Sequence, residues 1–242
     1  MKSFLKIIAL TIVSAAVFSA CSVKTDTFND DTKIPLRDGD TLSVQISVEY
    51  PCGNTPADSA MRRNILAAAF DMEEDPTTVE ETAAKYESNL QDAYFTEAQD
   101  LPVEGPFSWD DFVNGYFTDG HKKLLSYIVE YYSFRGGAHG VNTLTALVFD
   151  KKSGEPLQEK DIFVEDYSDG LSALLRKHLL EAFDGNEEEY GSLFITDIVP
   201  NGNFEPGKTG ITWYYQPYEI GPYSLGVIPV SVPWSELKPL LK

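Results

Sequence analysis

Residues 131–144, "YYSFRGGAHGVNTL", hold the side chain with the widest choice of chemistry, a histidine between glycines. An imidazole at His139 can serve as a catalytic base or a metal ligand, because it changes charge near neutral pH. Gly136 and Gly137 can take positive φ without steric cost, and β-forming runs flank them. The segment therefore predicts a tight connection between two strands. We expect His139 to be structural or part of a binding surface rather than a catalytic base.

Residues 214–226, "YYQPYEIGPYSLG", form a second unusual segment, with four tyrosines and two prolines between predicted strands. Tyrosine offers rigid contact area with an apolar ring and a polar tip. Two interpretations stay open: a rigid aromatic connection that closes the core, or a recognition surface. The candidate binding residues from the two segments are His139, Tyr218, Glu219 and Tyr223.

Recognised catalytic and metal-binding patterns are missing from the sequence. The three histidines, His121, His139 and His178, form no His-x-His, His-Glu-x-x-His or Cys-x-x-Cys pairing. The serines show no G-x-S-x-G elbow, and "RGGAHG" lacks the spacing and the lysine of a phosphate loop. We therefore predict no metal, no cofactor and no catalytic residue. We expect His178 to be a half-buried structural side chain and His121 to be exposed where a strand begins.

The N-terminal stretch "MKSFLKIIALTIVSAAVFSAC" has the parts of an export signal. Lys2 and Lys6 supply its positive charge, and the apolar run of residues 7–18 is shorter than the roughly 20 residues of a spanning helix. "FSAC" resembles the bacterial lipobox, in which cleavage precedes a lipid-modified cysteine. We predict a signal peptide at residues 1–20, lipidation of Cys21, and a location in the cell envelope, anchored to a membrane outside the cytoplasm. The alternative is an ordinary cleavage site with an incidental cysteine.

Charge narrows the choice of partners. The chain carries a formal net charge of −19, which becomes −21 when the signal takes Lys2 and Lys6 with it. Nucleic acid and anionic headgroups are poor partners for so acidic a domain, whereas a basic protein suits it. Lipidation of Cys21 would leave Cys52 as the remaining cysteine, so no internal disulfide is expected.

Hydrophobic periodicity predicts the elements that must position these residues. "TLSVQISVEYP" and "LLSYIVEYYSF" alternate as half-buried strands, and "ADSAMRRNILAAAF" and "LSALLRKHLLEAF" have helical spacing. A further helix follows Asp75, its predicted cap, and Pro76. Strands come in hairpin-like pairs with single helices between them. The fold class is therefore α+β, with a mainly antiparallel sheet and two small lobes sharing one core.

Four parts are predicted along the chain. Residues 1–20 are the signal, and residues 21–40, which lack hydrophobic periodicity, form a flexible tether. Residues 41–120 form an N-terminal α+β part, and residues 121–242 form a C-terminal α+β part that holds both unusual segments.

Three stretches carry a resemblance to a known family: "GGAHG" after a tyrosine-rich strand, "SGEPLQEKDIF", and "ITWYYQPYEIGPYSLGVIPVSVPWSEL". They resemble an extracytoplasmic domain of unknown function shared by RsiV-type anti-sigma factors and PdaC-type peptidoglycan deacetylases, over residues 42–240. The sequence shows neither the sigma-binding and membrane-spanning segments of the former nor the catalytic domain of the latter. We therefore expect neither activity.

The resemblance implies a binding module of the cell envelope, which in the anti-sigma relatives recognises lysozyme. Our first hypothesis is an envelope-anchored lipoprotein that binds lysozyme-like or other basic proteins, or cell-wall glycan. One alternative is an enzyme acting on peptidoglycan or another glycan, with His139 working beside a carboxylate such as Glu219. The other is a structural component of the envelope.

Overall fold

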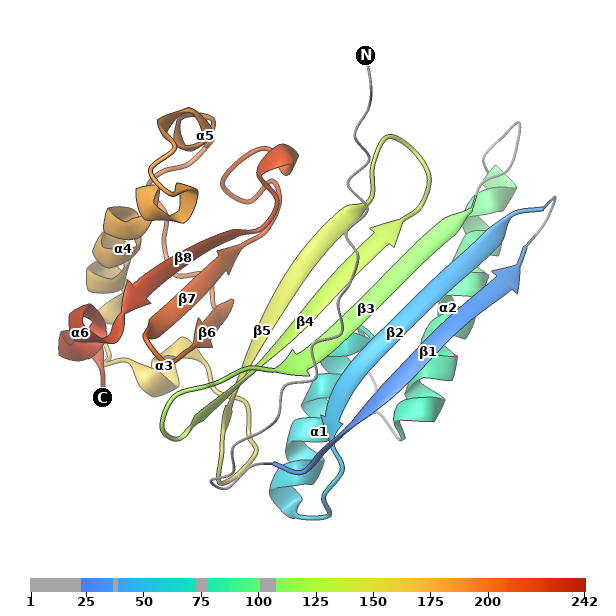
Figure 1. Ribbon diagram of the computed structural model, residues 1–242, viewed down its shortest axis with the longest axis horizontal. Helices are drawn as coiled ribbons and strands as arrows, with labels where there is room; N and C mark the ends of the chain where they lie inside the picture. Colours follow the sequence, from blue (N-terminus) through green and yellow to red (C-terminus); the bar gives the residue numbers. More distant parts are fainter. Residues whose placement is uncertain (1–22, 37–38, 73–77, 101–107) are drawn as a thin grey trace.

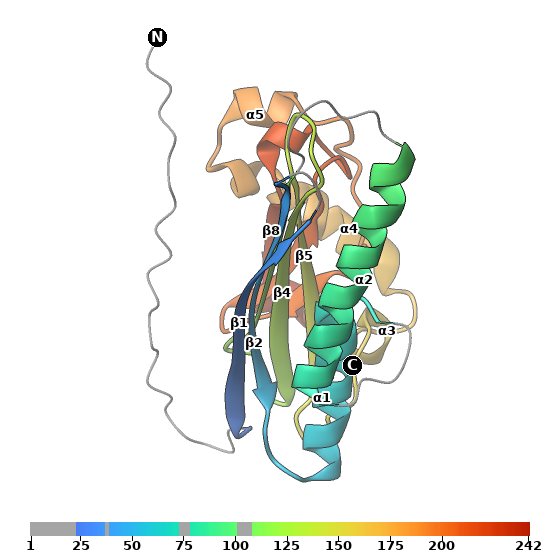
Figure 2. The same cartoon turned by 90° about the vertical axis from the view of Figure 1, so that its right-hand side faces the viewer.

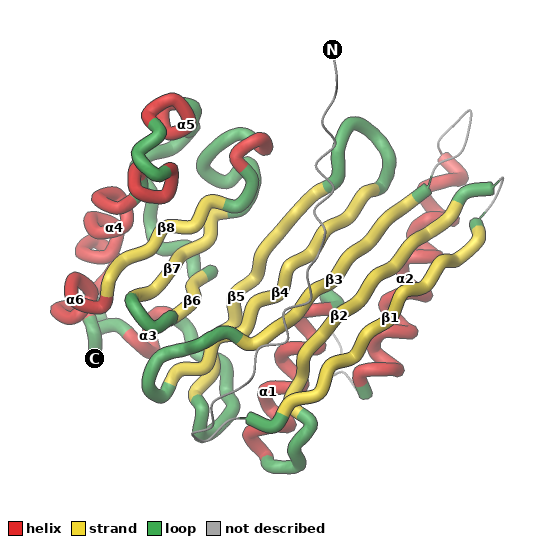
Figure 3. The backbone as a smooth tube through the Cα atoms, in the orientation of Figure 1, coloured by secondary structure: helices red, strands yellow, loops and turns green. Residues whose placement is uncertain are grey.

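The computed structural model describes residues 23–36, 39–72, 78–100 and 108–242, and its strands form two sheets beside each other (Figures 1 and 3). The larger sheet has five strands in chain order: β1 (Thr25–Pro35), β2 (Thr41–Pro51), β3 (Trp109–Phe117), β4 (Leu124–Phe134) and β5 (Val141–Asp150). The smaller sheet has β6 (Phe204–Pro206), β7 (Gly210–Tyr215) and β8 (Ile228–Pro233). All neighbouring strands are antiparallel except β2 and β3. The predicted α+β class with mainly antiparallel sheets is confirmed.

The parallel pair β2 and β3 needs a crossover, and two helices supply it. Helix α1 (Pro56–Ala69) begins at a capping box between Thr55 and Asp58, with Pro56 in its first turn. Helix α2 (Val79–Asp100) follows, and Figure 2 shows both helices against one face of the larger sheet. The predicted cap of α2, Asp75, lies outside the described residues.

A first core lies between these helices and the sheet. The apolar phase of β2, Leu42, Val44, Ile46 and Val48, is buried as its alternation predicted. These side chains pack with residues of α1, α2, β3 and β4, among them Met61, Ile65, Tyr94, Trp109, Val113 and Tyr127. The apolar face of the larger sheet is thereby covered by α1 and α2.

The C-terminal part of the chain has a second core. This part contains the helices α3 (Glu159–Ile162), α4 (Tyr167–His178), α5 (Glu187–Gly191) and α6 (Trp234–Leu237). In this core the apolar stripe of α4 packs against β7 and β8. The buried side chains include Leu171 and Leu175 of α4, Trp213 of β7, and Val230 and Val232 of β8. The sequence predicted one core shared by two lobes, whereas the structure has two cores that meet at β5, where Val148 belongs to the second and Phe149 to the first.

Side-chain amides join the two parts at the edge of β5. The Leu144 amide donates to the Gln216 side-chain oxygen at 3.1 Å, and the Leu144 carbonyl accepts from Gln216 at 2.6 Å and from Asn203 at 2.8 Å. The Ala146 amide donates to Asn203 at 2.7 Å. Because these amides bond as a neighbouring strand would, this stretch of β5 is not left as an open edge.

The flexible tether predicted for residues 21–40 is wrong over Thr25–Pro35, which forms β1. Every residue of β1 faces a partner in β2, and Phe28 and Ile34 pack against the first core. The segment lacks an apolar run because it is an outer strand, held chiefly by its backbone hydrogen bonds.

The boundary predicted between residues 120 and 121 is also displaced. It falls between β3 and β4, which pair antiparallel within the same sheet. The division between the two cores follows β5 instead. The predicted signal peptide and Cys21 lie outside the described residues. Within the described ranges, no helix has the length and apolar character needed to cross a membrane.

Candidate functional site

The predicted tight connection joins β4 to β5 through residues 135–140. Gly136 and Gly137 have φ values of 83° and 95°, which confirms that this turn needs glycine. Gly140 is buried against Tyr132, since a Cβ there would lie 2.3 Å from the tyrosine ring. His139 lies between Gly137 and the buried Gly140, and it is exposed.

Three of the four candidate binding residues meet in space. The ring of His139 stacks on Tyr223 with centroids 4.0 Å apart and an interplanar angle of 17°, and Tyr218 lies 5.8 Å from Tyr223. The Tyr223 hydroxyl donates to the Gly140 carbonyl at 2.6 Å, and Nδ1 of His139 lies 2.9 Å from the same oxygen. We call His139, Tyr218 and Tyr223 the aromatic ridge.

Tyr218 is the ridge residue with an unusual backbone. The residue is 60% exposed and its φ is 70°, a left-handed conformation that bulky residues seldom adopt. Such a backbone costs on the order of 1–3 kcal/mol and is concentrated at functional sites. The strain therefore supports the ridge as a contact surface.

Glu219, the fourth candidate, holds the loop together and takes no part in the ridge. Its Oε2 accepts from the Gln216 amide at 2.7 Å, and its Oε1 accepts from Asn201 at 3.0 Å. Within the described ranges, no hydrogen bond joins Glu219 to His139. In this arrangement Glu219 bonds to Gln216 and Asn201 and does not orient His139.

The other two histidines have structural surroundings. His178 is buried, and its Nδ1 lies 2.6 Å from Glu181. The ring of His121 stacks on Trp234 with centroids 4.2 Å apart, and it is partly buried rather than exposed. In the described part of the chain, no group of three or more His, Cys, Asp or Glu side chains could hold a metal ion.

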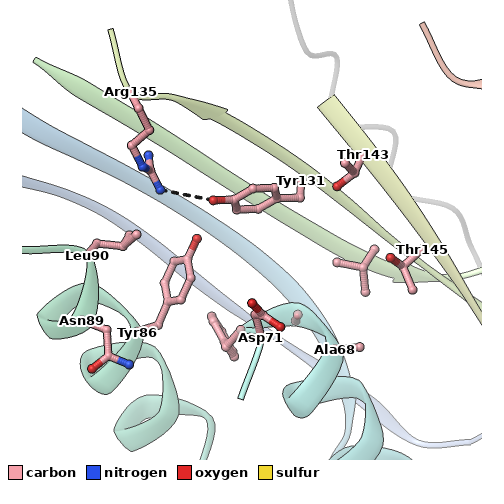
Figure 4. Close-up of a pocket in the computed structure, with 12 residues that line it drawn as sticks. Ala68, Asp71, Tyr86, Asn89, Leu90, Tyr131, Arg135, Thr143 and Thr145 are labelled. Atoms are coloured by element: carbon pink, nitrogen blue, oxygen red, sulfur yellow. Dashed lines mark hydrogen bonds between the residues drawn. The ribbon is translucent and has the colours of Figure 1, made fainter. Parts of the chain in front are cut away.

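A cavity of about 520 Å³ lies between the two helices and the β4–β5 side of the larger sheet (Figure 4). Sequence reasoning did not find it. Its walls come from the end of α1, from α2, from β4 and β5, and from Arg135 in the glycine turn; the lining includes Phe70, Asp71, Tyr86, Asn89, Tyr131 and Thr145.

A polar network around the buried Asp111 reaches the wall of this cavity through Tyr86, Tyr131 and Arg135. The Asp111 side chain is fully buried and pairs with Arg135 through both carboxylate oxygens. The hydroxyls of Tyr86 and Tyr131 donate to Oδ1 of Asp111 at 3.0 and 2.6 Å. The guanidinium carbon of Arg135 also lies 4.5 Å from the ring centroid of Trp109. Asp111 thus has partners for both oxygens, as a buried charge requires.

The network shifts the protonation of its own members. Burial, followed by the negative charge of Asp111, raises the pKa of Tyr86 well above its ordinary value. Burial and the hydrogen bond to Asp111 raise the pKa of Tyr131. Burial opposes the charge on Arg135, but the bonds and charge of Asp111 outweigh it and raise the pKa of the guanidinium. Both tyrosines therefore stay neutral donors and Arg135 stays charged at neutral pH.

The sequence held a signal for this network in "WDDFVNG". Asp111 alternates in phase with Trp109 and Val113, and all three are buried. An acid in the buried phase of a strand must have a partner. The partner comes from the glycine turn, so one six-residue turn reaches the cavity through Arg135 and the ridge through His139.

Comparison with known proteins bears on the family and the fold. Residues 160–235 match a family described as "Protein of unknown function (DUF3298)". No curated protein matches the chain. The expected relation to RsiV-type and PdaC-type proteins stays a prediction.

Two solved structures resemble the chain over most of its length. One is a DUF3298 family member from Bacteroides fragilis, with a TM-score of 0.74 and 22% identity, covering 90% of this chain and 93% of that one. The other is a DUF3298 family protein from Pseudomonas aeruginosa, with a TM-score of 0.65 and 17% identity, covering 91% and 95%. At these identities the likeness concerns the fold. The chain thus contains a DUF3298 domain at residues 160–235, within an architecture similar to that of two DUF3298 structures.

Proposed function

We propose that this protein is a binding module of the cell envelope, anchored through a lipid on Cys21, and that the aromatic ridge contacts its ligand. The observation that carries the proposal is the stack of His139, Tyr223 and Tyr218, with Tyr218 exposed on a left-handed backbone. An exposed ring contributes little to the core, so core packing does not account for this strain.

A lysozyme-like basic protein is the ligand that the charge favours. The formal net charge of −19 attracts a basic partner and speeds its encounter. Charge alone would attract any basic protein, so specificity must come from desolvated contacts. Exposed tyrosine is well suited to such contacts, since it buries a large area with few rotatable bonds. Cell-wall glycan, which also stacks on aromatic rings, is the competing ligand.

A titration separates these ligands. The protein is titrated with lysozyme at low and at near-molar salt, with an unrelated protein of similar basic charge as control, and is pulled down in parallel with wall fragments. Specific binding keeps a salt-resistant component that the control protein lacks. Equal binding of both proteins at low salt and of neither at high salt would reduce the interaction to charge. Capture by wall fragments alone would make glycan the ligand.

Two variants test whether the ligand contacts the aromatic ridge. Tyr218→Ala should weaken the specific complex by about 30-fold, as expected for an interface hot spot worth about 2 kcal/mol. Phe95→Ala is the matched control, because Phe95 is a partly exposed aromatic residue on α2. Equal losses in the two variants would contradict a role for the ridge.

A further inference from the structure

We propose that the cavity between α1, α2 and the β4–β5 side of the larger sheet binds a neutral, hydroxyl-rich small molecule, a saccharide of one or two rings. This site is separate from the aromatic ridge, and the inference does not rest on the function proposed above. Its volume of about 520 Å³ falls within the range of about 300–1,000 Å³ that small-molecule sites occupy.

Unpaired polar side chains surround this cavity. Asp71, Asn89, Thr143 and Thr145 line the cavity and have no side-chain hydrogen bond within the described part of the chain; all but Thr143 are exposed, so their polar groups are open to a ligand. Figure 4 shows Asp71 and Asn89 on the helix side and the two threonines on the sheet side. Together they offer a carboxylate, an amide and two hydroxyls, a mixture of donors and acceptors that matches neighbouring sugar hydroxyls.

The same cavity also has apolar walls. Ala68, Ala69, Phe70, Leu90 and Val129 contribute to its walls. A pyranose ring has apolar faces and a polar rim, so it can use both kinds of wall at once. Ligand sites of this kind combine a mostly apolar wall with a few polar groups that set orientation.

Asp71 supplies the one charged side chain among the four polar groups named above. It follows α1 with φ of 48°, a conformation that glycine adopts most easily after a helix. Its carboxylate also lies at the C-terminal end of α1, where the helix dipole disfavours negative charge. Asp71 shares these features with Asp184 but differs from it in lining the cavity, where its exposed carboxylate can accept hydrogen bonds from a ligand.

The charges of the site select a neutral ligand. Arg135 is already neutralised by its bidentate pair with Asp111, so it provides no free anion-binding charge. Asp71 has no cationic partner in the described residues and repels anions. A cation finds no free carboxylate at the Arg135 end of the cavity, because Asp111 is fully buried and already paired with Arg135. A neutral molecule with many hydroxyls can hydrogen-bond to the polar side chains of the cavity without repulsion from Asp71.

The test is binding of matched sugars to the full chain, measured by calorimetry and ligand-observed NMR. The probes are glucose, N-acetylglucosamine, cellobiose and chitobiose as neutral ligands, with protonated glucosamine and glucuronate as charged analogues. At least one neutral sugar should bind more tightly than both charged analogues. No binding by any neutral sugar, or equal binding of the charged ones, would overturn the proposal.

Asp71→Asn is the diagnostic variant, since asparagine tolerates the left-handed backbone and the fold is retained. It should weaken sugar binding by about tenfold or more, the loss expected for a hydrogen bond to a charged group. Asp184→Asn is the matched control, because Asp184 is exposed with φ of 51° in the C-terminal part.

The melting temperature of Asp71→Asn should equal or exceed that of the wild type, because the substitution removes a charge from the helix end. Equal affinities of the Asp71 and Asp184 variants would refute the assignment to this cavity.

Discussion

Replacing Arg135 by methionine should destabilise the fold strongly, because it leaves the buried carboxylate of Asp111 without its cation. The Asp111 side chain has no exposure and that of Arg135 is 28% exposed, so water cannot substitute for the lost partner. Removing one member of a buried ion pair typically costs about 3–5 kcal/mol. That is a large share of the roughly 5–15 kcal/mol that stabilises a domain. For a chain of this size it corresponds to a fall in Tm of about 6–20 °C.

The same substitution at Arg176 provides the control. Arg176 pairs with Asp197, but the two side chains are 40% and 82% exposed. Exposed pairs contribute about 0–1 kcal/mol, so Arg176→Met should change the unfolding free energy very little. The double variant Asp111→Asn, Arg135→Met removes both charges yet keeps an acceptor for Tyr86 and Tyr131. It should recover most of the stability that Arg135→Met loses.

Urea unfolding at neutral pH, followed by circular dichroism and tyrosine fluorescence, measures these free energies by linear extrapolation. Arg135→Met should lose clearly more unfolding free energy than Arg176→Met. A loss below about 1 kcal/mol for Arg135→Met would show that the pair is solvated. A double variant as unstable as the single one would show that Arg135 acts through its packing on Trp109, not through its charge.

Three further predictions concern other parts of the chain. Burial and neighbouring Asp30 raise the pKa of Glu87 to about 7, above its unfolded value of 4.5, so the folded state binds the extra proton. The unfolding free energy should therefore fall as the pH rises from the unfolded pKa of 4.5 to the folded pKa of about 7. In urea titrations at several pH values, Glu87→Gln should reduce this pH dependence. Gly137→Ala should cost about 1 kcal/mol of unfolding free energy, because φ is 95° at this position. Gly191→Ala, at the end of α5 with open space around it, should not destabilise the fold. Equal melting temperatures of the two variants would contradict the need for glycine in the turn. Cys21→Ala should release the protein into the soluble fraction or leave it as precursor, and unchanged size and detergent dependence would argue against lipidation.

Local patterns in the sequence were sufficient for several elements. The alternation of Leu42, Val44, Ile46 and Val48 predicted a half-buried strand, and all four are buried. Gly136 and Gly137 of the β4–β5 turn predicted positive φ, which both adopt. Periodicity and backbone preference act between residues close in the chain, so they can be read without knowledge of the fold.

Contacts between distant residues had to come from the tertiary structure. β1 has a polar sequence and becomes a strand because β2 offers it a complete edge. Asp111 gains its cation from a turn 24 residues later, and His139 gains its stacking partner, Tyr223, from the other part of the chain. Strand pairing and the neutralisation of a buried charge depend on which segments meet, and periodicity carries no information on that. The sequence alone therefore determined the kinds of elements and singled out the ridge residues, whereas only the tertiary structure brought those residues together and formed the cavity.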